Sequence, residues 1–267
     1  MSQTTLADAV GRMQERMAVE RATPIPTFVR EDPDYEPPAR TWACDHCHDL
    51  HVVDDGGRIV PCPDCGAAHH AERLRRLCGL APAMERWTVA QFRAQTSEAK
   101  AARTSARQAV KRRTGWLTLW GPWGTGKTFL LAAVVNECRQ AGHLAVYTTV
   151  ADLLDELRET FDAASGESYS TRFERYRRAK VLALDELEKF RASEWAEEKF
   201  FQLIETRYER ADTCLTLFAT NNRVSPGAKV VPATRYPGYL ESRLLDGRFA
   251  VHEIGGGDLR PRNKWEE

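Results

Sequence analysis

The sequence of 267 residues predicts an α/β domain, in which helices cover both faces of a parallel sheet, preceded by a small metal-binding module. From Gly115 onwards, short apolar runs alternate with longer amphipathic segments, a pattern typical of strands joined by helices in a parallel sheet. Before that point, four of the seven cysteines form two closely spaced pairs, and such spacing in a chain without an export signal favours metal binding over disulfides.

The composition sets the broad class of the protein. It is 42% hydrophobic and 28% charged, as in an ordinary globular protein, and 38 basic residues balance 38 acidic ones. No run of 18 apolar residues predicts a membrane span, and Met1–Glu20 is too polar for a secretory signal. We therefore expect a cytoplasmic protein with no membrane partner.

The apolar and amphipathic segments of the α/β part can be assigned in order. The predicted strands are residues 116–120, 144–147, 181–184, 215–219 and 249–254. The predicted helices are residues 127–141, 151–162, 194–210 and 238–246. The chain divides into five predicted parts: a short helix and Pro-rich linker (1–40), a zinc-binding module (41–80), a basic linker and helix (81–114), the α/β core (115–260) and a tail (261–267).

A glycine-rich turn follows the first predicted strand of the core. Gly121–Thr128, with the sequence GPWGTGKT, fits the phosphate-loop pattern G-x-x-x-x-G-K-[ST]. Glycines let successive backbone N–H groups face a phosphate, and the following helix directs its positive end at the same anion. The candidate nucleotide-binding residues are Gly121, Pro122, Trp123, Gly124, Thr125, Gly126, Lys127, Thr128 and Phe129. We expect Lys127 to reach the β- and γ-phosphates of ATP and Thr128 to ligate Mg²⁺.

Polar residues also follow two later strands. Asp185 and Glu186 end the apolar run 181–184, where we expect Asp185 to hold Mg²⁺ and Glu186 to deprotonate the attacking water. Asn221 follows the run 215–219 and could hydrogen-bond the γ-phosphate or the water. The alternatives are structural: such acids often cap a helix, and Asn favours turns.

An arginine near the end of the last predicted helix is a candidate for action in a neighbouring subunit. Arg243 could stabilise transition-state charge in that subunit's ATP site, as an arginine finger. Arg235, Arg248 and Arg260 are rivals on chemistry alone, and a solvated surface charge is the alternative.

The two cysteine pairs predict a closed zinc site. Cys44 and Cys47 form one C-x-x-C pair, Cys62 and Cys65 the other, and 14 residues separate them. Asp55-Gly56 between apolar residues predicts a hairpin joining the pairs, as in a zinc ribbon. A redox pair or an unoccupied thiol cluster is the alternative. Five nearby histidines could replace a ligand, but four thiolates already complete a tetrahedral shell: His46, His48, His51, His69 and His70.

The segment between the cysteines and the core is basic. Residues 67–113 contain 11 Lys or Arg against 3 Glu, an excess that could neutralise nucleic-acid phosphates. Trp87 and Phe92 lie within it and could stack on bases. The alternative is a solvated helix over residues 97–113.

Together these motifs resemble those of the AAA+ ATPases of the DnaC/DnaI type, the loaders of the replicative helicase, and of the related IstB-like transposition ATPases. The resemblance covers residues 85–260. It rests on the phosphate loop and on further motifs, which are Trp87–Phe92, Leu182–Glu186, Trp195, Ile204–Tyr208, Thr220-Asn221 and Ser242–Leu244. Glu188 departs from the family, which often has Gly there, and we expect this departure to leave the two acids unaffected.

The resemblance implies an ATPase with Asn221 as sensor and Arg243 as finger. It also implies self-association with ATP at subunit interfaces, single-stranded DNA as a ligand, and the hexameric replicative helicase as the partner of the zinc module. Only 13 residues follow the last predicted strand, so we expect no C-terminal helical lid. Two other hypotheses remain open: an IstB-like helper of transposition that binds duplex DNA, and a non-catalytic adaptor with structural ATP.

Overall fold

The computed structural model describes residues 42–56, 58–161, 167–191, 193–224 and 238–259. The predicted helix within residues 1–20, the Pro-rich linker, Arg235 and Arg260 lie outside the described residues. None of the described helices is long and apolar enough to cross a membrane.

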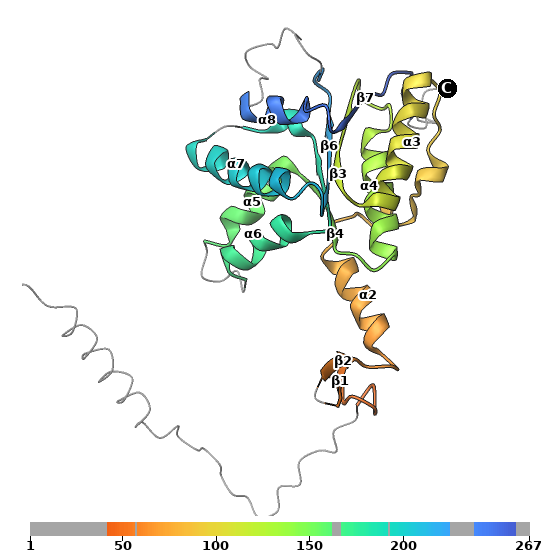
Figure 1. Ribbon diagram of the computed structural model, residues 1–267, viewed down its shortest axis with the longest axis vertical. Helices are drawn as coiled ribbons and strands as arrows, with labels where there is room; N and C mark the ends of the chain where they lie inside the picture. The colour runs from red at the N-terminus through yellow and green to blue at the C-terminus, as the bar shows by residue number, and fades with distance from the viewer. Residues whose placement is uncertain (1–41, 57, 162–166, 192, 225–237, 260–267) are drawn as a thin grey trace, which may run out of the picture. The chain divides into compact units, whose positions relative to one another are not determined.

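A five-stranded parallel sheet forms the centre of the fold, in the order β4-β5-β6-β3-β7 (Figure 1). The strands are β3 Gly115–Trp120, β4 Ala145–Thr149, β5 Val181–Asp185, β6 Leu215–Thr220 and β7 Ala250–Glu253. These strands confirm the predicted fold class. Since all five run in one direction, the residues that follow β3, β5 and β6 meet at the same edge of the sheet.

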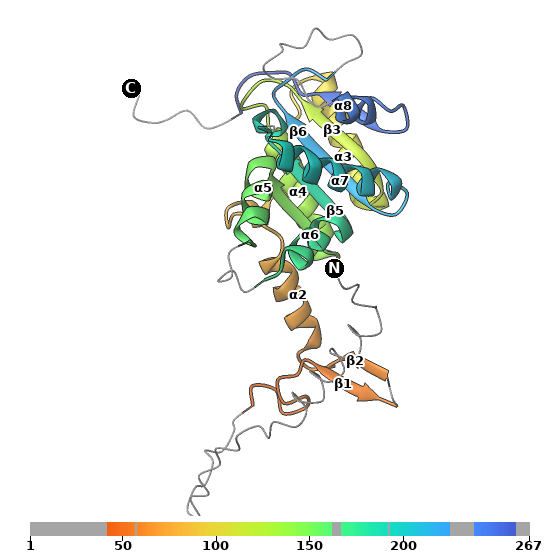
Figure 2. The same cartoon turned by 90° about the vertical axis from the view of Figure 1, so that its left-hand side faces the viewer.

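Helices cover both faces of this sheet, as Figures 1 and 2 show. One face carries α3 Ser97–Arg112 and α4 Lys127–Gln140. The other face carries α5 Val150–Glu159, α6 Tyr169–Arg178, α7 Glu194–Glu209 and α8 Gly238–Leu244. In β5, Val181 and Ala183 pack in the hydrophobic cluster on the face covered by α3 and α4. Leu182 and Leu184 pack in the cluster on the opposite face, covered by α5 to α8. Burial on both faces explains why the strand reads as an uninterrupted apolar run.

Helix α3 packs on the sheet, although the sequence suggested a linker and helix ahead of the core. Its inner face consists of four buried alanines, which are Ala99, Ala102, Ala106 and Ala109. Their short side chains pack with Leu117, Leu119 and Leu130 in one hydrophobic cluster. The Thr96 hydroxyl begins the helix by accepting a hydrogen bond from the backbone N–H of Ala99 at 3.1 Å. The apolar core therefore begins before Gly115.

Two helices among the described residues were not predicted from the sequence. Helix α2, Gly66–Arg76, begins directly after Cys65, and α6 lies between α5 and β5. Only Phe173 and Tyr176 of α6 are buried, and the rest of the helix is dominated by charged and polar residues. Two buried residues are too few for the helical spacing of apolar side chains to be recognised in the sequence of α6.

Candidate nucleotide-binding site and metal centre

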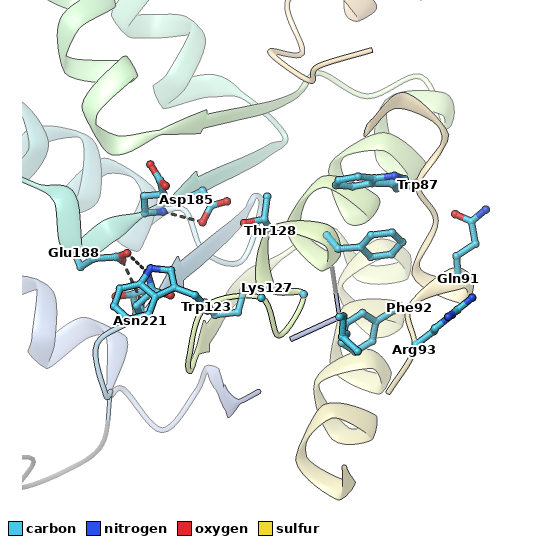
Figure 3. Close-up of a pocket in the computed structure, with 16 residues that line it drawn as sticks. Trp87, Gln91, Phe92, Arg93, Trp123, Lys127, Thr128, Asp185, Glu188 and Asn221 are labelled. Carbon is cyan, nitrogen blue, oxygen red and sulfur yellow. Dashed lines mark hydrogen bonds between the residues drawn. The ribbon is translucent and has the colours of Figure 1, made fainter. Parts of the chain in front are cut away.

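A cavity of about 560 Å³ lies at the carboxyl edge of the sheet (Figure 3). Its lining comes from the loop between β3 and α4, from the residues that follow β5 and β6, and from residues 87–93 ahead of α3. The predicted residues among its lining are Trp123, Gly124, Gly126, Lys127, Thr128, Phe129, Asp185, Glu186 and Asn221. Tertiary structure thus brings together motifs that lie almost a hundred residues apart, in a volume typical of small-molecule sites.

The phosphate loop needs glycine at its points of closest approach. Gly126 has a φ of +92°, and a Cβ there would lie 2.7 Å from the ring of Phe92. Gly121 has a φ of +147°, and its Cβ would lie 2.3 Å from the carbonyl oxygen of Ile254. Any other residue would be strained and would clash. The loop is therefore shaped by contacts from outside it, as well as by its own sequence.

Lys127 is folded back onto the loop that precedes it. Its side chain is only 7% exposed, and Nζ donates hydrogen bonds to the carbonyl oxygens of Gly121 at 2.8 Å and Pro122 at 2.6 Å. Burial lowers the pKa of Lys127, while the negative charges of Asp185 and Glu188 oppose that shift. The amine thus stands at the phosphate loop in a shell of oxygen atoms, which phosphate oxygens can replace.

Asp185 is fixed at the end of β5. It is 4% exposed, and its Oδ2 accepts a hydrogen bond from the Tyr147 hydroxyl at 2.8 Å. Its Oδ1 accepts from the backbone N–H of Glu186 at 2.8 Å. Burial and the neighbouring Asp185 raise the pKa of Tyr147, so the phenol remains a neutral donor. A carboxylate held in this way, in a cavity that Thr128 also lines, suits a divalent cation.

Glu186 adopts a different arrangement from its neighbour. Its backbone is left-handed, with φ +53° and ψ +44°, which is uncommon outside glycine. Its side chain forms an ion pair of 2.8 Å with Lys189 in the following one-turn helix η4, Leu187–Lys189. The candidate base therefore has a cationic partner three residues away.

Asn221 contacts an acid to which sequence reasoning assigned no role. Its backbone N–H donates to Oε2 of Glu188 at 3.1 Å, and its side-chain amide donates to Oε1 of the same residue. Both residues line the cavity. Sequence reasoning expected only that Glu188 leaves the two acids unaffected, and it missed this contact with Asn221. The available signal was its place two residues after Glu186, where the resembling family often has Gly.

The far side of the cavity is aromatic. Trp87 stacks on Phe129 with ring centroids 4.8 Å apart and 24° between the planes, and Phe92 lies 6.2 Å from Phe129. Phe92 is only 3% exposed because it packs against the phosphate loop. The suggestion that Phe92 stacks on DNA bases is therefore wrong. Trp123, in the loop itself, is 73% exposed.

Arg243 is not among the cavity-lining residues. It lies on α8, where it forms an ion pair with Glu205 of α7 and donates to the carbonyl oxygen of Tyr239 at 2.9 Å. Its rival Arg248 forms an ion pair of 2.8 Å with Asp246.

The four predicted zinc ligands are clustered. The sulfur atoms of Cys44, Cys47, Cys62 and Cys65 all lie within 4.8 Å of one another, and none of these residues forms a disulfide. Sulfurs around a tetrahedral zinc ion lie about 3.8 Å apart for a typical Zn–S bond. Strands β1 Val52–Asp55 and β2 Arg58–Pro61 form the predicted antiparallel hairpin between the pairs. The donor set and its geometry fit a zinc ribbon.

Polar groups surround three of the four sulfurs, those of Cys47, Cys62 and Cys65. The backbone N–H of His51 donates to Cys47 Sγ at 3.3 Å, and His51 Nδ1 lies 3.3 Å from Cys65 Sγ. Burial opposes ionisation of Cys62, but hydrogen bonds from the backbone of Cys65 and Asp64 outweigh it and lower the pKa of Cys62 to about 7. Such outer contacts orient metal ligands.

Comparisons with known proteins agree with this geometry. A family model described as an IstB-like ATP-binding protein matches residues 67–224. An ATP-binding protein of an IS21-like insertion sequence from Bacteroides fragilis is 33% identical over 148 residues, which are 55% of this chain and 54% of that protein. The chromosomal replication initiator DnaA of Nautilia profundicola is 30% identical over 101 residues, 38% of this chain and 22% of that protein. The chain spans about half or less of the length of these relatives.

Solved structures share the fold. The structure of DnaI has a TM-score of 0.54 and 21% identity, covering 70% of this chain and 100% of that one. The DnaC helicase loader has a TM-score of 0.54 and 20% identity, covering 66% of this chain and 100% of that one. The family match extends over more than half of the sequence and includes the phosphate loop, the acidic pair and Asn221. The chain belongs to the family of IstB-like ATP-binding proteins, with a P-loop fold of the AAA+ type and a cysteine cluster that fits a zinc ribbon.

Proposed function

We propose that this protein is an ATPase that loads the replicative DNA helicase onto single-stranded DNA. The observation that carries the ATPase part is the cavity, because it gathers a phosphate loop, two acids and an amide at one edge of the sheet. The proposed catalytic residues are Lys127, Glu186 and Asn221, with Arg243 supplied by a neighbouring copy.

Each residue has a distinct part in hydrolysis. Lys127 would exchange the carbonyls of its own loop for β- and γ-phosphate oxygens. Thr128 and Asp185 would hold Mg²⁺, which offsets the charge that develops on the phosphates. Glu186 would leave Lys189 and accept a proton from the attacking water, while Asn221 orients the γ-phosphate.

The surface of the zinc ribbon supports a protein partner rather than DNA. Leu50 and Ile59 are 72% and 68% exposed, and Val52 is 40% exposed. Residues 42–65 carry five aspartates and one basic residue, Arg58. Negative charge repels the phosphate backbone, whereas exposed apolar side chains suit a protein interface. We assign this surface to the helicase.

Helix α3 supports contact with DNA. Lys100, Arg107 and Lys111 are exposed and lie at positions i, i+7 and i+11, which return to one face of a helix. The stripe is roughly 16 Å long and opposite the buried alanine face. Point charges on a rigid helix can neutralise successive phosphates. We assign this stripe to the backbone of single-stranded DNA.

A second candidate is a helper ATPase of transposition. The family description and the relative from Bacteroides fragilis favour it. Such a protein would prefer duplex DNA and would bind a transposase. An adaptor with structural ATP is less favoured, because Lys127, Thr128, Asp185 and Glu186 are all present.

The test uses zinc-loaded full-length protein with purified helicase from its own host. In ATP, the Glu186→Gln variant should bind nucleotide as the wild type does, hydrolyse none, and retain the helicase in a stable complex with single-stranded DNA. Lys127→Ala should bind no nucleotide and form no such complex. If the protein instead captures the host transposase on duplex DNA and does not bind the helicase, the result would support a helper ATPase of transposition in place of a helicase loader. Unchanged function in Glu186→Gln would favour the adaptor.

A further inference from the structure

Glu188 holds Asn221 with both of its carboxylate oxygens. One accepts from the backbone N–H of Asn221 at 3.1 Å, and the other accepts from its side-chain amide, so the two contacts form a clamp (Figure 3). Glu188 projects from the one-turn helix η4, which is anchored beneath by the fully buried Leu187. The clamp therefore joins the turn after β5 to the end of β6 inside the cavity.

The clamp occupies the side-chain amide of Asn221, which is the hydrogen-bond donor that we expect a γ-phosphate to use. Glu188, Asn221 and Lys127 line one cavity, and the charge of Glu188 is felt at Lys127, whose pKa it raises against the effect of burial. A γ-phosphate contacted by Lys127 and Asn221 would approach the carboxylate of Glu188. The two anions repel each other, and both are acceptors that compete for a single amide.

We propose that Glu188 senses the γ-phosphate: it holds Asn221 when the site contains ADP or nothing, and ATP displaces it. The inference rests on the proposed nucleotide binding and adds a residue that discriminates between ATP and ADP. ADP has no group to compete for Asn221, so the clamp stays closed. ATP has such a group, and binding must then include the cost of opening the clamp.

Opening the clamp also bears on the candidate base. Glu186 and Lys189 flank Glu188, and their ion pair spans the same turn. Glu186 already has a left-handed backbone at the start of this turn. A turn that moves when Glu188 leaves Asn221 would loosen the contact between Glu186 and Lys189. Release of Glu186 from Lys189 would in this way depend on the presence of a γ-phosphate.

The inference is tested by calorimetric titration of the full-length protein with ADP and with AMPPCP, in Mg²⁺. In Glu188→Ala, the affinity for AMPPCP should rise on the order of tenfold, since a hydrogen bond to a charged group no longer has to be broken. The affinity for ADP should stay within about twofold. Glu188→Gln retains an acceptor but no charge, so its gain should be smaller. Asp212→Ala removes the same charge from an exposed site at the opposite end of β6 and should change neither affinity.

Coupling to Asn221 distinguishes a clamp from simple repulsion. In the Asn221→Ala background, Glu188→Ala should give a clearly smaller gain for AMPPCP, because the competition for the amide is gone. Equal changes for both nucleotides, or a loss of AMPPCP affinity, would overturn the proposal. So would a Glu188→Gln variant with unchanged affinities and no hydrolysis, which would make Glu188 the base. A wild type that binds neither nucleotide would refute the proposed function itself, and the clamp with it.

Discussion

Arg243 of α8 is ion-paired with Glu205 of α7, and its guanidinium carbon lies 5.1 Å from the centre of the Tyr208 ring. The side chain is 20% exposed, so the pair is partly shielded from solvent. An arginine finger must leave such a partner to reach a neighbouring subunit. Its action would therefore depend on the interface between copies, and not on the cavity of its own chain.

A mixing experiment tests this role for Arg243. Arg243→Ala should bind ATP normally but hydrolyse it at least about a hundredfold more slowly in the assembled protein, because fingers supply large factors in rate. Lys127→Ala should be inactive for lack of nucleotide. Mixing the two should restore part of the activity, since some interfaces then pair an intact Lys127 with an intact Arg243. The Arg248→Ala variant serves as the control and should keep its activity; the guanidinium of Arg248 also lies over the Tyr208 ring, at 4.9 Å from its centre.

We expect the four clustered cysteines to bind zinc and the cysteines of the hydrophobic core not to bind it. The purified protein should contain one zinc ion per chain, and Cys62→Ser or Cys47→Ser should lose most of it. Cys78 and Cys138 lie in the core, where burial raises the pKa of their thiols to about 11 and about 12. These neutral thiols are poor ligands, so Cys78→Ser should retain full zinc content. Elemental analysis measures the outcome, and zinc loss from Cys78→Ser would contradict the assignment.

The stripe on α3 can be tested by the salt dependence of DNA binding. Replacing Lys100, Arg107 and Lys111 by Ala should weaken binding to single-stranded DNA for all sequences alike. It should also reduce the slope of log K against log salt by about 2, since each phosphate contact contributes about 0.7. Arg112→Ala, on another side of the same helix, should have a smaller effect. An unchanged slope in the triple variant would place the DNA elsewhere.

Arg207 is a buried cation without a carboxylate partner among the described residues. It is fully buried, and its guanidinium donates to the carbonyl oxygens of Tyr176 and Ala179, each at 3.0 Å, and of Leu215 at 2.5 Å. Desolvation lowers its pKa to about 10, so it remains charged at neutral pH.

Removal of the Arg207 side chain should lower the stability of the fold rather than affect catalysis. Arg207→Met leaves three buried carbonyls without their donor, so the free energy of unfolding should fall by about 3 kcal/mol or more. Urea denaturation measures the change. Arg210→Ala, an exposed arginine at the end of the same helix, should alter stability by less than about 0.5 kcal/mol. A stable Arg207→Met variant that has lost ATP binding would point to a role at the nucleotide site.

The sequence by itself determined the class of fold and most of the candidate site. Strand β5 was visible as an uninterrupted apolar run because both of its faces are buried. Gly121–Thr128 was visible because a backbone that curls around phosphate needs glycine at fixed intervals. The cysteine pairs were visible because a small tetrahedral ion demands short spacing within each pair. Each of these requirements is local, so it can be recognised from residues that are close together in the sequence.

Only the tertiary structure decided which distant residues meet. Glu188 reaches Asn221 because β5 and β6 are adjacent in the sheet, and the 32 residues of sequence between Glu188 and Asn221 do not reveal that adjacency. Phe92 is buried against Gly126, so it cannot serve DNA, and the alanine face of α3 belongs to the core. Partner choice among side chains depends on the three-dimensional arrangement of elements. A hydrogen bond is made at about 3 Å whatever the distance along the chain.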